Sequence, residues 1–426
     1  MSMEEQKDPL EHTEEQEEEQ EFSFLQETIK DEAGGTKKTR KNILRMIGLG
    51  LVFGIAASFS FCVLKPWFER QLQSNPEKVT IPKEEEQEDT ADEDGTKDGT
   101  QQVLDEESYR QMNQALNAVA QEAAKSVVEI NGISGEEGWL EADYDKKNSV
   151  SGLIIADNGQ QLLMLAKTSI LKESNEVTVT FCDGKTYKAG VKKKDSNLGL
   201  GIYAVNRNDI QESTWSQSKI AVLGSSNSLS KGETAIAIGK PFNYAGGAGY
   251  GIISSNKNAI DTADGQYRLI CTDIPGTVKG TGFIVNLKGE VTGIIDQSIS
   301  DEDSMKLTTA YGISDLKELI ELLSNGKAVP YVGILGIDVT ESIEQQGIPQ
   351  GVYVKEVEVD SPAMSAGIQS GDIITSIGGA EIKTVSGYQS VLIDKAVGTK
   401  VKIKGQRQGS GGYVDIDFNV TIGSKE

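Results

Sequence analysis

The stretch Gly282-Phe283-Ile284-Val285-Asn286-Leu287-Lys288-Gly289-Glu290-Val291-Thr292-Gly293-Ile294-Ile295 decides the fold class of this chain. It holds two short runs rich in β-branched and aromatic residues, 282–286 and 291–295, separated by a turn that contains Gly289. Such residues favour strands, and glycine favours turns. The stretch therefore predicts two neighbouring strands of a mainly β protein.

Runs of the same kind recur in the preceding part of the chain, with Gly, Asn and Asp at the turns between them. They are Val127–Ile133, Val150–Ile155, Gln161–Leu165, Val177–Phe181, Gly201–Val205, Ala235–Ile238, Gly251–Ile253 and Leu269–Thr272. Many short strands at this spacing predict a β-barrel or a sandwich. Apolar residues at helical spacing predict one helix over 108–126, before the strands, and another over 313–324, after them.

The first part of the chain has the pattern of a membrane anchor between acidic segments. Residues 1–41 carry thirteen acidic residues, a composition typical of a disordered tail. Residues 42–66 follow the basic cluster Lys37-Lys38-Thr39-Arg40-Lys41 and are apolar enough to cross a membrane as one helix. The cluster predicts a cytoplasmic N-terminus and extracytoplasmic C-terminal domains in the cell membrane. A signal peptide is the alternative, but the long acidic tail before it favours an anchor. Residues 67–108 are again acidic and predict an extended linker.

The net charge and the histidine content argue against some classes of partner and of catalytic or metal site in the folded part. The 65 acidic and 42 basic residues give a net charge of −23, which argues against nucleic acid as a partner. The only histidine, His12, lies in the acidic tail, so we expect neither a histidine base nor a histidine metal site in the folded part. No metal and no cofactor is predicted. Cys182 and Cys271 could form a disulfide, but their spacing favours two separate buried strands.

Motifs in both halves of the β region resemble one known family. The first half contains Ser151-Gly152-Leu153-Ile154-Ile155, a turn at Asn158-Gly159 and a strand that ends in Asp183-Gly184. The second contains Leu223-Gly224-Ser225-Ser226, Ala237-Ile238-Gly239-Lys240-Pro241 and Val285-Asn286-Leu287-Lys288-Gly289-Glu290-Val291. Over most of residues 110–424 the sequence resembles the HtrA family of serine proteases. The resemblance implies a trypsin-like double β-barrel over 109–327 and an α+β PDZ domain over 328–426.

The resemblance also locates the positions of the family's catalytic triad. Counting back fourteen residues from Asp183, as the family spacing requires, puts the general base at Ser169. The family's orienting carboxylate corresponds to Gly199, in Lys194-Asp195-Ser196-Asn197-Leu198-Gly199. Aligning the nucleophile loop on Val285-Asn286 puts the serine position at Gly280, and a one-residue deletion would leave Thr281 as the fallback nucleophile.

These replacements predict a catalytically degenerate member of the family. A triad works because an imidazole accepts the proton of the serine and a carboxylate orients that imidazole. Ser169, Gly199 and Gly280 supply no such relay, so we expect a pseudoprotease. The alternative is an active endopeptidase with a lysine–hydroxyl dyad, either Lys279 with Thr281 or Lys167 with Ser169.

The resemblance implies a peptide-binding site in the last segment. Tyr331-Val332-Gly333-Ile334 corresponds to the carboxylate-binding loop of a PDZ domain, and Gly371-Asp372-Ile373-Ile374 matches a later strand. Successive backbone N–H groups of such a loop can hold the terminal carboxylate of a peptide, while the strand from Gly333 pairs with the peptide. Tyr388 and Leu392 would close the groove and favour an apolar last side chain. The alternative is that Gly333 only forms a turn.

The sequence therefore predicts a membrane-anchored pseudoprotease that binds peptides or protein C-termini, as a scaffold, as a sensor or in envelope quality control. A further interpretation makes the chain a signal transmitter, in which the cytoplasmic tail responds to the outer domains. Members of the family often form trimers, but no aromatic cluster precedes Val127 to supply such contacts. Monomer and homotrimer both stay open.

Overall fold

The computed structural model describes residues 76–82, 105–133, 149–174, 176–299 and 307–425. The predicted acidic tail and the predicted membrane helix lie outside these residues, as does most of the predicted linker. Among the residues that the structure describes, no helix is both long and apolar enough to span a membrane.

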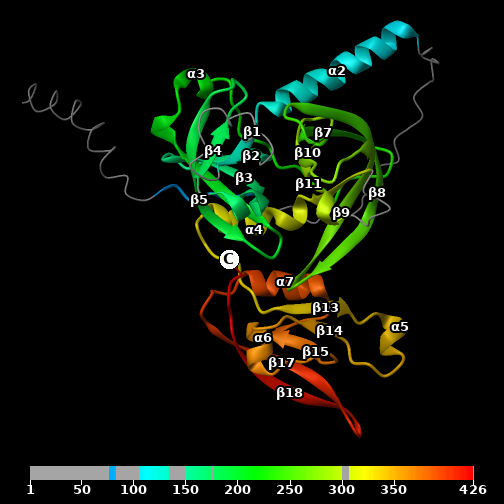
Figure 1. The fold of residues 1–426 in the computed structure, drawn as a ribbon. Coiled ribbons are helices and arrows are strands. Elements are labelled where there is room, and N and C mark those ends of the chain that lie inside the picture. The colour runs from blue at the N-terminus through cyan, green and yellow to red at the C-terminus, as the bar shows by residue number, and fades with distance from the viewer. Residues whose placement is uncertain (1–75, 83–104, 134–148, 175, 300–306, 426) are drawn as a thin grey trace, which may run out of the picture. The chain divides into compact units, whose positions relative to one another are not determined.

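The first six strands form a closed antiparallel barrel in the order β1-β2-β3-β6-β5-β4 (Figure 1). Its strands are β1 (Val127–Ile133), β2 (Ser149–Asp157), β3 (Gln161–Lys167), β4 (Glu176–Thr180), β5 (Thr186–Asp195) and β6 (Leu200–Asn206). Alternate residues of these strands point inward, and they fill the barrel with apolar side chains such as Ile130, Met164 and Tyr203. The 3-10 helix η2 (Thr168–Glu173) follows β3 directly.

The next six strands close a second barrel in the order β10-β11-β12-β9-β8-β7. They are β7 (Thr234–Lys240), β8 (Gly247–Thr262), β9 (Gly265–Pro275), β10 (Thr281–Val285), β11 (Val291–Asp296) and β12 (Leu307–Gly312). The strands β8 and β9 are the longest pair, and their hairpin extends from the barrel to α7 and β13 (Figure 1). Register shifts within β8, near Ser255, bend this hairpin.

A third apolar cluster joins the two barrels. It contains Leu153 and Leu165 from the first barrel, Ile236 and Phe283 from the second, and the buried face of α4 (Lys317–Ser324). The helix α2 (Glu106–Ala124) begins at the N-cap Asp105 and packs its C-terminal end, through residues such as Ala120, on the same cluster. This cluster between the barrels is additional to the apolar clusters inside each of them.

Residues 76–82 differ from the predicted extended linker. Their backbone is tied to α4 and the residue after it, because Val79 N–H donates to Asn325 Oδ1 at 3.0 Å and Ile81 N–H donates to Glu321 Oε2 at 3.2 Å. Ile81 is buried in the cluster between the barrels. The acidic residues around this segment led to the prediction of a linker. Its two apolar side chains, Val79 and Ile81, pack on the cluster between the barrels.

The last part of the chain is an antiparallel sheet of order β13-β14-β15-β17-β18, with β16 paired to β15. Its elements are β13 (Ile334–Asp338), α5 (Glu341–Glu344), β14 (Val352–Val357), α6 (Pro362–Ala366), β15 (Ile373–Ile377), β16 (Ala380–Glu381), α7 (Val385–Ile393), β17 (Lys400–Gly409) and β18 (Gly412–Thr421). It has its own core, built around residues such as Val354, Ile374 and Phe418. Because β13 is the edge strand, one side of it can accept another strand.

The prediction of a mainly β fold with two barrels and an α+β domain is confirmed. Each predicted strand corresponds to an observed one, and the helix predicted over 313–324 is a 3-10 turn, η6 (Ser314–Leu316), followed by α4. Two strands of the barrels were missed, β5 and β12. The strand β5 contains three consecutive lysines, Lys192 to Lys194, and only Ala189 and Asp195 are buried, so its apolar pattern is weak. The strand β12 is short, and its sequence Leu307-Thr308-Thr309-Ala310-Tyr311-Gly312 mixes polar and small residues with few large apolar ones.

Candidate functional site

The first candidate site comprises the positions that correspond to the family's triad. Ser169 is exposed on η2, directly after Thr168, whose N–H donates to the carbonyl oxygen of Gly199 at 2.8 Å. Gly199 has a φ of 64°, and a Cβ added to it would lie 3.8 Å from Thr168 Oγ1. The fold therefore brings the positions assigned to the general base and to the orienting carboxylate close together. Neither residue supplies an imidazole or a carboxylate.

The nucleophile position is sterically closed. A Cβ on Gly280 would lie 2.5 Å from the carbonyl oxygen of Pro241 and 2.9 Å from that of Thr277, and both neighbours are backbone atoms that cannot rotate away. The Gly280 N–H donates to the same Thr277 oxygen at 2.7 Å, which holds the turn in this shape. A serine therefore does not fit at Gly280 without a shift of the loop.

The fallback nucleophile, Thr281, is used as a structural group. Its side chain is buried, and its Oγ1 accepts the Ser151 N–H at 3.0 Å. The two hydroxyl oxygens lie 3.4 Å apart. Ser151 belongs to β2 of the first barrel and Thr281 to β10 of the second, so this contact fastens the barrels together.

The two lysines of the alternative dyads have different surroundings. The Lys167 ammonium forms an ion pair with Asp296, which is buried at the end of β11, and also donates to Ser298 Oγ at 3.4 Å. The Lys167 ammonium is therefore already engaged by a carboxylate and a hydroxyl. Lys279 is exposed to solvent, so it lacks the desolvation that a lysine base needs.

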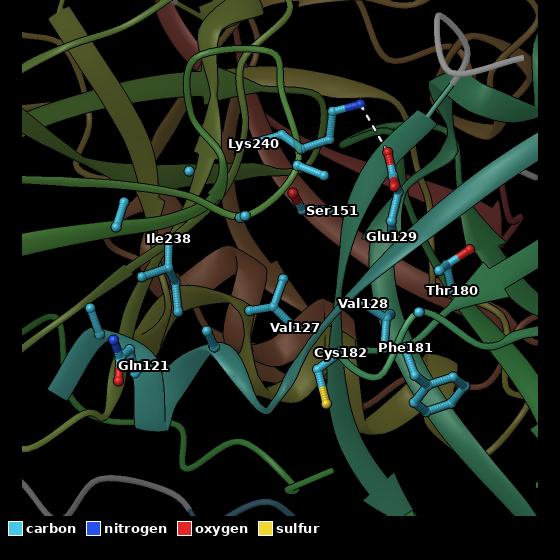
Figure 2. Close-up of a pocket in the computed structure, with 18 of the residues that line it drawn as sticks. Gln121, Val127, Val128, Glu129, Ser151, Thr180, Phe181, Cys182, Ile238 and Lys240 are labelled. Carbon is cyan, nitrogen blue, oxygen red and sulfur yellow. Dashed lines mark hydrogen bonds and ion pairs between the residues drawn. The ribbon is translucent and has the colours of Figure 1, made fainter. Parts of the chain in front are cut away.

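A separate cavity of about 600 Å³ opens between α2, β1 and β7 (Figure 2). The buried Lys240 ammonium faces it and pairs with Glu129 Oε1 at 3.3 Å, as the dashed line in Figure 2 marks. Ser151 also reaches this cavity, but its lining includes neither Ser169 nor Gly280. The cavity therefore combines a neutralised ion pair with apolar walls and is not the place of the degenerate triad.

The second candidate site is the loop before β13, where three backbone N–H groups converge on one carboxylate. Asp264 Oδ2 accepts from Val332 at 2.6 Å and from Gly333 at 2.7 Å, and Oδ1 accepts from Ile334 at 3.0 Å. Gly333 has a φ of 90°, and a Cβ there would lie 2.4 Å from Ser361 Cβ, so only glycine suits this position. The loop predicted to bind carboxylates thus holds one from its own chain.

The predicted groove residues surround this carboxylate. The Tyr388 hydroxyl on α7 donates to Asp264 Oδ1 at 2.7 Å, and Leu392 is buried in the same core. Tyr331 contributes differently, because its backbone N–H donates to the carbonyl oxygen of Gly423 and its hydroxyl bonds to Glu358. The cradle is therefore made by the three residues after Tyr331.

The electrostatics of the cradle follow from its burial. Burial raises the pKa of Asp264, while the hydrogen bonds from Gly333, Ile334, Tyr388 and Val332 oppose that rise. Burial and the charge of Asp264 raise the pKa of Tyr388 well above its ordinary value, so the hydroxyl stays a proton donor. The site is built to receive an oxyanion through neutral donors.

Asp264 was missed by the sequence analysis. The Asp264-Gly265 pair between strand-like residues is a known hairpin signal, and the structure has the tip of the β8–β9 hairpin there. Nothing in that signal says that the tip meets a loop about seventy residues further on. Among the described residues, no group of three or more His, Cys, Asp or Glu is arranged to hold a metal, and Cys182 and Cys271 are free thiols.

Sequence comparisons agree with this architecture. The PDZ domain family matches residues 333–418. Serine protease Do-like HtrB of Bacillus subtilis (strain 168) is 29% identical over 281 residues, which cover 61% of this chain and 59% of that protein. Serine protease Do-like HtrA of Lactobacillus helveticus is 28% identical over 298 residues, which cover 64% of this chain and 68% of that protein. The match thus spans less than two thirds of the Bacillus subtilis relative.

Solved structures share the fold. A structure described as HtrA-type protease AlgW with decapeptide has a TM-score of 0.52 and 19% identity, covering 73% of this chain and 99% of that one. One described as HtrA-type protease AlgW with tripeptide has a TM-score of 0.51 and 21% identity, covering 73% and 97%. At this identity the likeness bears on the fold alone. The chain thus has a PDZ domain after two six-stranded barrels, and both its sequence and its fold are similar to those of HtrA-type serine proteases.

Proposed function

We propose that this chain is an HtrA-family pseudoprotease that binds peptides or protein C-termini through its PDZ domain. The observation that carries the proposal is the cradle of Val332, Gly333 and Ile334, whose three N–H groups already bind a carboxylate at 2.6 to 3.0 Å. A peptide C-terminus offers the same group, followed by a backbone that can pair with the edge strand β13. The two AlgW structures, one with a decapeptide and one with a tripeptide, are consistent with this use.

The first site supports the proposal that this chain does not hydrolyse peptide bonds. Ser169, Gly199 and Gly280 occupy the three triad positions. None of them supplies the imidazole that accepts the proton of an alcohol or the carboxylate that orients it. Gly280 has no room for a side chain, and the hydroxyl of Thr281 is committed to Ser151. Both points favour a binding protein over an endopeptidase, although the curated relatives carry the name serine protease.

The membrane anchor over residues 42–66 and the extracytoplasmic location are part of the proposal and rest on sequence alone. A chain anchored in this way would present the PDZ domain to exposed protein C-termini outside the cytoplasm, as a scaffold, a sensor or a part of envelope quality control. The oligomeric state, monomer or homotrimer, does not alter this role.

The proposal is tested with the purified full-length chain in detergent. We expect a labelled decapeptide that ends in valine with a free carboxylate to bind, and its amidated twin to bind at least about tenfold more weakly, because a charged hydrogen-bond acceptor is lost. Fluorescence anisotropy measures both affinities. Gly333→Val should abolish the difference, because its side chain would collide with Ser361.

The alternative of an active endopeptidase is separated in the same preparation. We expect no casein hydrolysis and no labelling by a fluorophosphonate probe. Hydrolysis that disappears in Thr281→Ala would instead establish a threonine-type dyad and contradict the pseudoprotease proposal.

A further inference from the structure

We propose that the tip of the β8–β9 hairpin is an internal ligand of the PDZ domain, and that a peptide C-terminus binds only by displacing Asp264. The inference rests on the proposed function of the groove and adds its regulation. It predicts that the intact chain binds peptides more weakly than the same groove would without Asp264 in it.

The hairpin tip makes the contacts expected of a bound peptide, through the side chain of Asp264 and through its backbone. The Asp264 carboxylate takes the three N–H groups of the cradle and the hydroxyl of Tyr388. The Asp264 N–H donates to the carbonyl oxygen of Ile334 at 2.8 Å. The preceding residue, Ala263, forms an antiparallel bridge with Leu335 of β13. A carboxylate in the loop and a short strand beside β13 are the two contacts expected of a peptide in such a groove.

Occupancy by the tip excludes a second carboxylate. Asp264 is buried, and each of the three cradle N–H groups has one hydrogen bond to it. A peptide carboxylate at the same place would bring two negative charges together in a buried site, at high cost. The peptide and Asp264 therefore compete for one position.

The tip is held by contacts on both sides of the groove. Asn197 Nδ2, from the first barrel, donates to the Ala263 carbonyl oxygen at 2.6 Å. Gln389 Oε1, from α7, accepts the Gln266 N–H at 3.2 Å. Asp264 itself lies in the left-handed region with a φ of 62°, a conformation that Gly adopts freely and that Asn and Asp adopt more often than other side-chain-bearing residues. These contacts hold the tip in place while Asp264 occupies the cradle.

The experiment compares peptide affinity among variants of the full-length chain. Asp264→Gly removes the carboxylate and suits the positive φ, and Asp264→Asn keeps the shape while removing the charge. Asp261→Asn is the matched control, because Asp261 is exposed on the same hairpin and pairs only locally with Gln266. The probe is the labelled decapeptide that ends in valine, with its amidated twin.

We expect Asp264→Gly to bind the free-carboxylate peptide about tenfold or more tightly than wild type, because a competing state no longer reduces the available fraction. Asp264→Asn should move in the same direction and Asp261→Asn should match wild type. Equal affinities in wild type and both Asp264 variants would overturn the inference and leave the proposed function intact.

A chain that binds the peptide in no variant would instead contradict the proposed function. Amide hydrogen exchange then decides the inference by itself. Slow exchange at Val332, Gly333 and Ile334 in wild type that becomes fast in Asp264→Gly supports an internal ligand, and unchanged exchange overturns it.

Discussion

At the scale of single residues, the space around Gly280 determines what the cleft can accept. A side chain there meets two carbonyl oxygens within 3 Å, so Gly280→Ser should lower the free energy of unfolding by about 1 to 3 kcal/mol. It should not create casein hydrolysis, because the only histidine of the chain is His12. Chemical denaturation and a casein assay measure the two effects. Gly411→Ser, at a position with no atom near its added Cβ, is the control and should be neutral.

Thr281 permits a second test at this scale. Thr281→Val keeps the shape of the side chain but leaves the buried Ser151 N–H without its acceptor, so we expect a loss of about 1 to 3 kcal/mol in the free energy of unfolding. Thr421→Val, at an exposed position of β18, is the control. If Thr281→Val had the stability of wild type, the hydroxyl would not fasten the barrels as described.

The sequence identified some site residues and not others for a physical reason. Motif spacing placed Ser169, Gly199 and the Gly333 loop, because each belongs to a local pattern of strands and turns. Asp264 was not predicted, because its partners lie in another domain and only the three-dimensional fold brings them together. A local pattern can predict a turn but cannot predict what the turn touches.

At the scale of elements, strands were predictable where apolar residues alternate or run together. The fully buried β10 and β11 have strong patterns, whereas the lysine-rich β5 has a weak one. The length of β8 was also missed, because only 251–253 of its sixteen residues read as a strand. Its outer part is exposed and polar, and pairing with β9 rather than burial makes it a strand.

Lys425, beyond β18, forms an ion pair with Glu358, in the loop after β14. The stability that this pair provides should depend on pH. Burial alone would raise the pKa of Glu358, but hydrogen bonds from Lys425 and Tyr331 outweigh it and lower the pKa below its ordinary value of 4.5. A lowered pKa in the folded state means that the stabilisation is present at neutral pH and is lost as the pH falls through that lowered pKa.

We therefore expect Glu358→Gln to be less stable than wild type at pH 7, by roughly 1 kcal/mol or less, because the pair is partly exposed to solvent. The difference should disappear as the pH is lowered below the ordinary value of 4.5. Thermal unfolding of both proteins across this range measures it. A difference that stays constant with pH would rule out this ion pair as its source.

At the scale of the whole molecule, three parts of the fold meet at the hairpin tip. Asn197 comes from the first barrel, Ala263 and Asp264 from the second, and Val332 to Ile334 from the PDZ domain. A nearby bond from the Ser196 N–H to the carbonyl oxygen of Lys425, at 2.9 Å, also joins the first barrel to the end of the chain. The loop that contains the orienting position Gly199 thus touches both the internal ligand and the PDZ domain.

This arrangement makes the first barrel a contributor to peptide affinity although it does not line the cradle. Asn197→Ala removes one hydrogen bond that exists only while the tip is docked, so docking should lose about 1 kcal/mol. We expect the full-length variant to bind the free-carboxylate decapeptide up to about fivefold more tightly than wild type in the anisotropy assay. Asn206→Ala, whose amide bonds to the exposed Asp209 on the same barrel, should leave the affinity unchanged. In the Asp264→Gly background, Asn197→Ala should have no further effect, because the two residues act on one docked state; additive effects would mean that Asn197 influences the groove by another route.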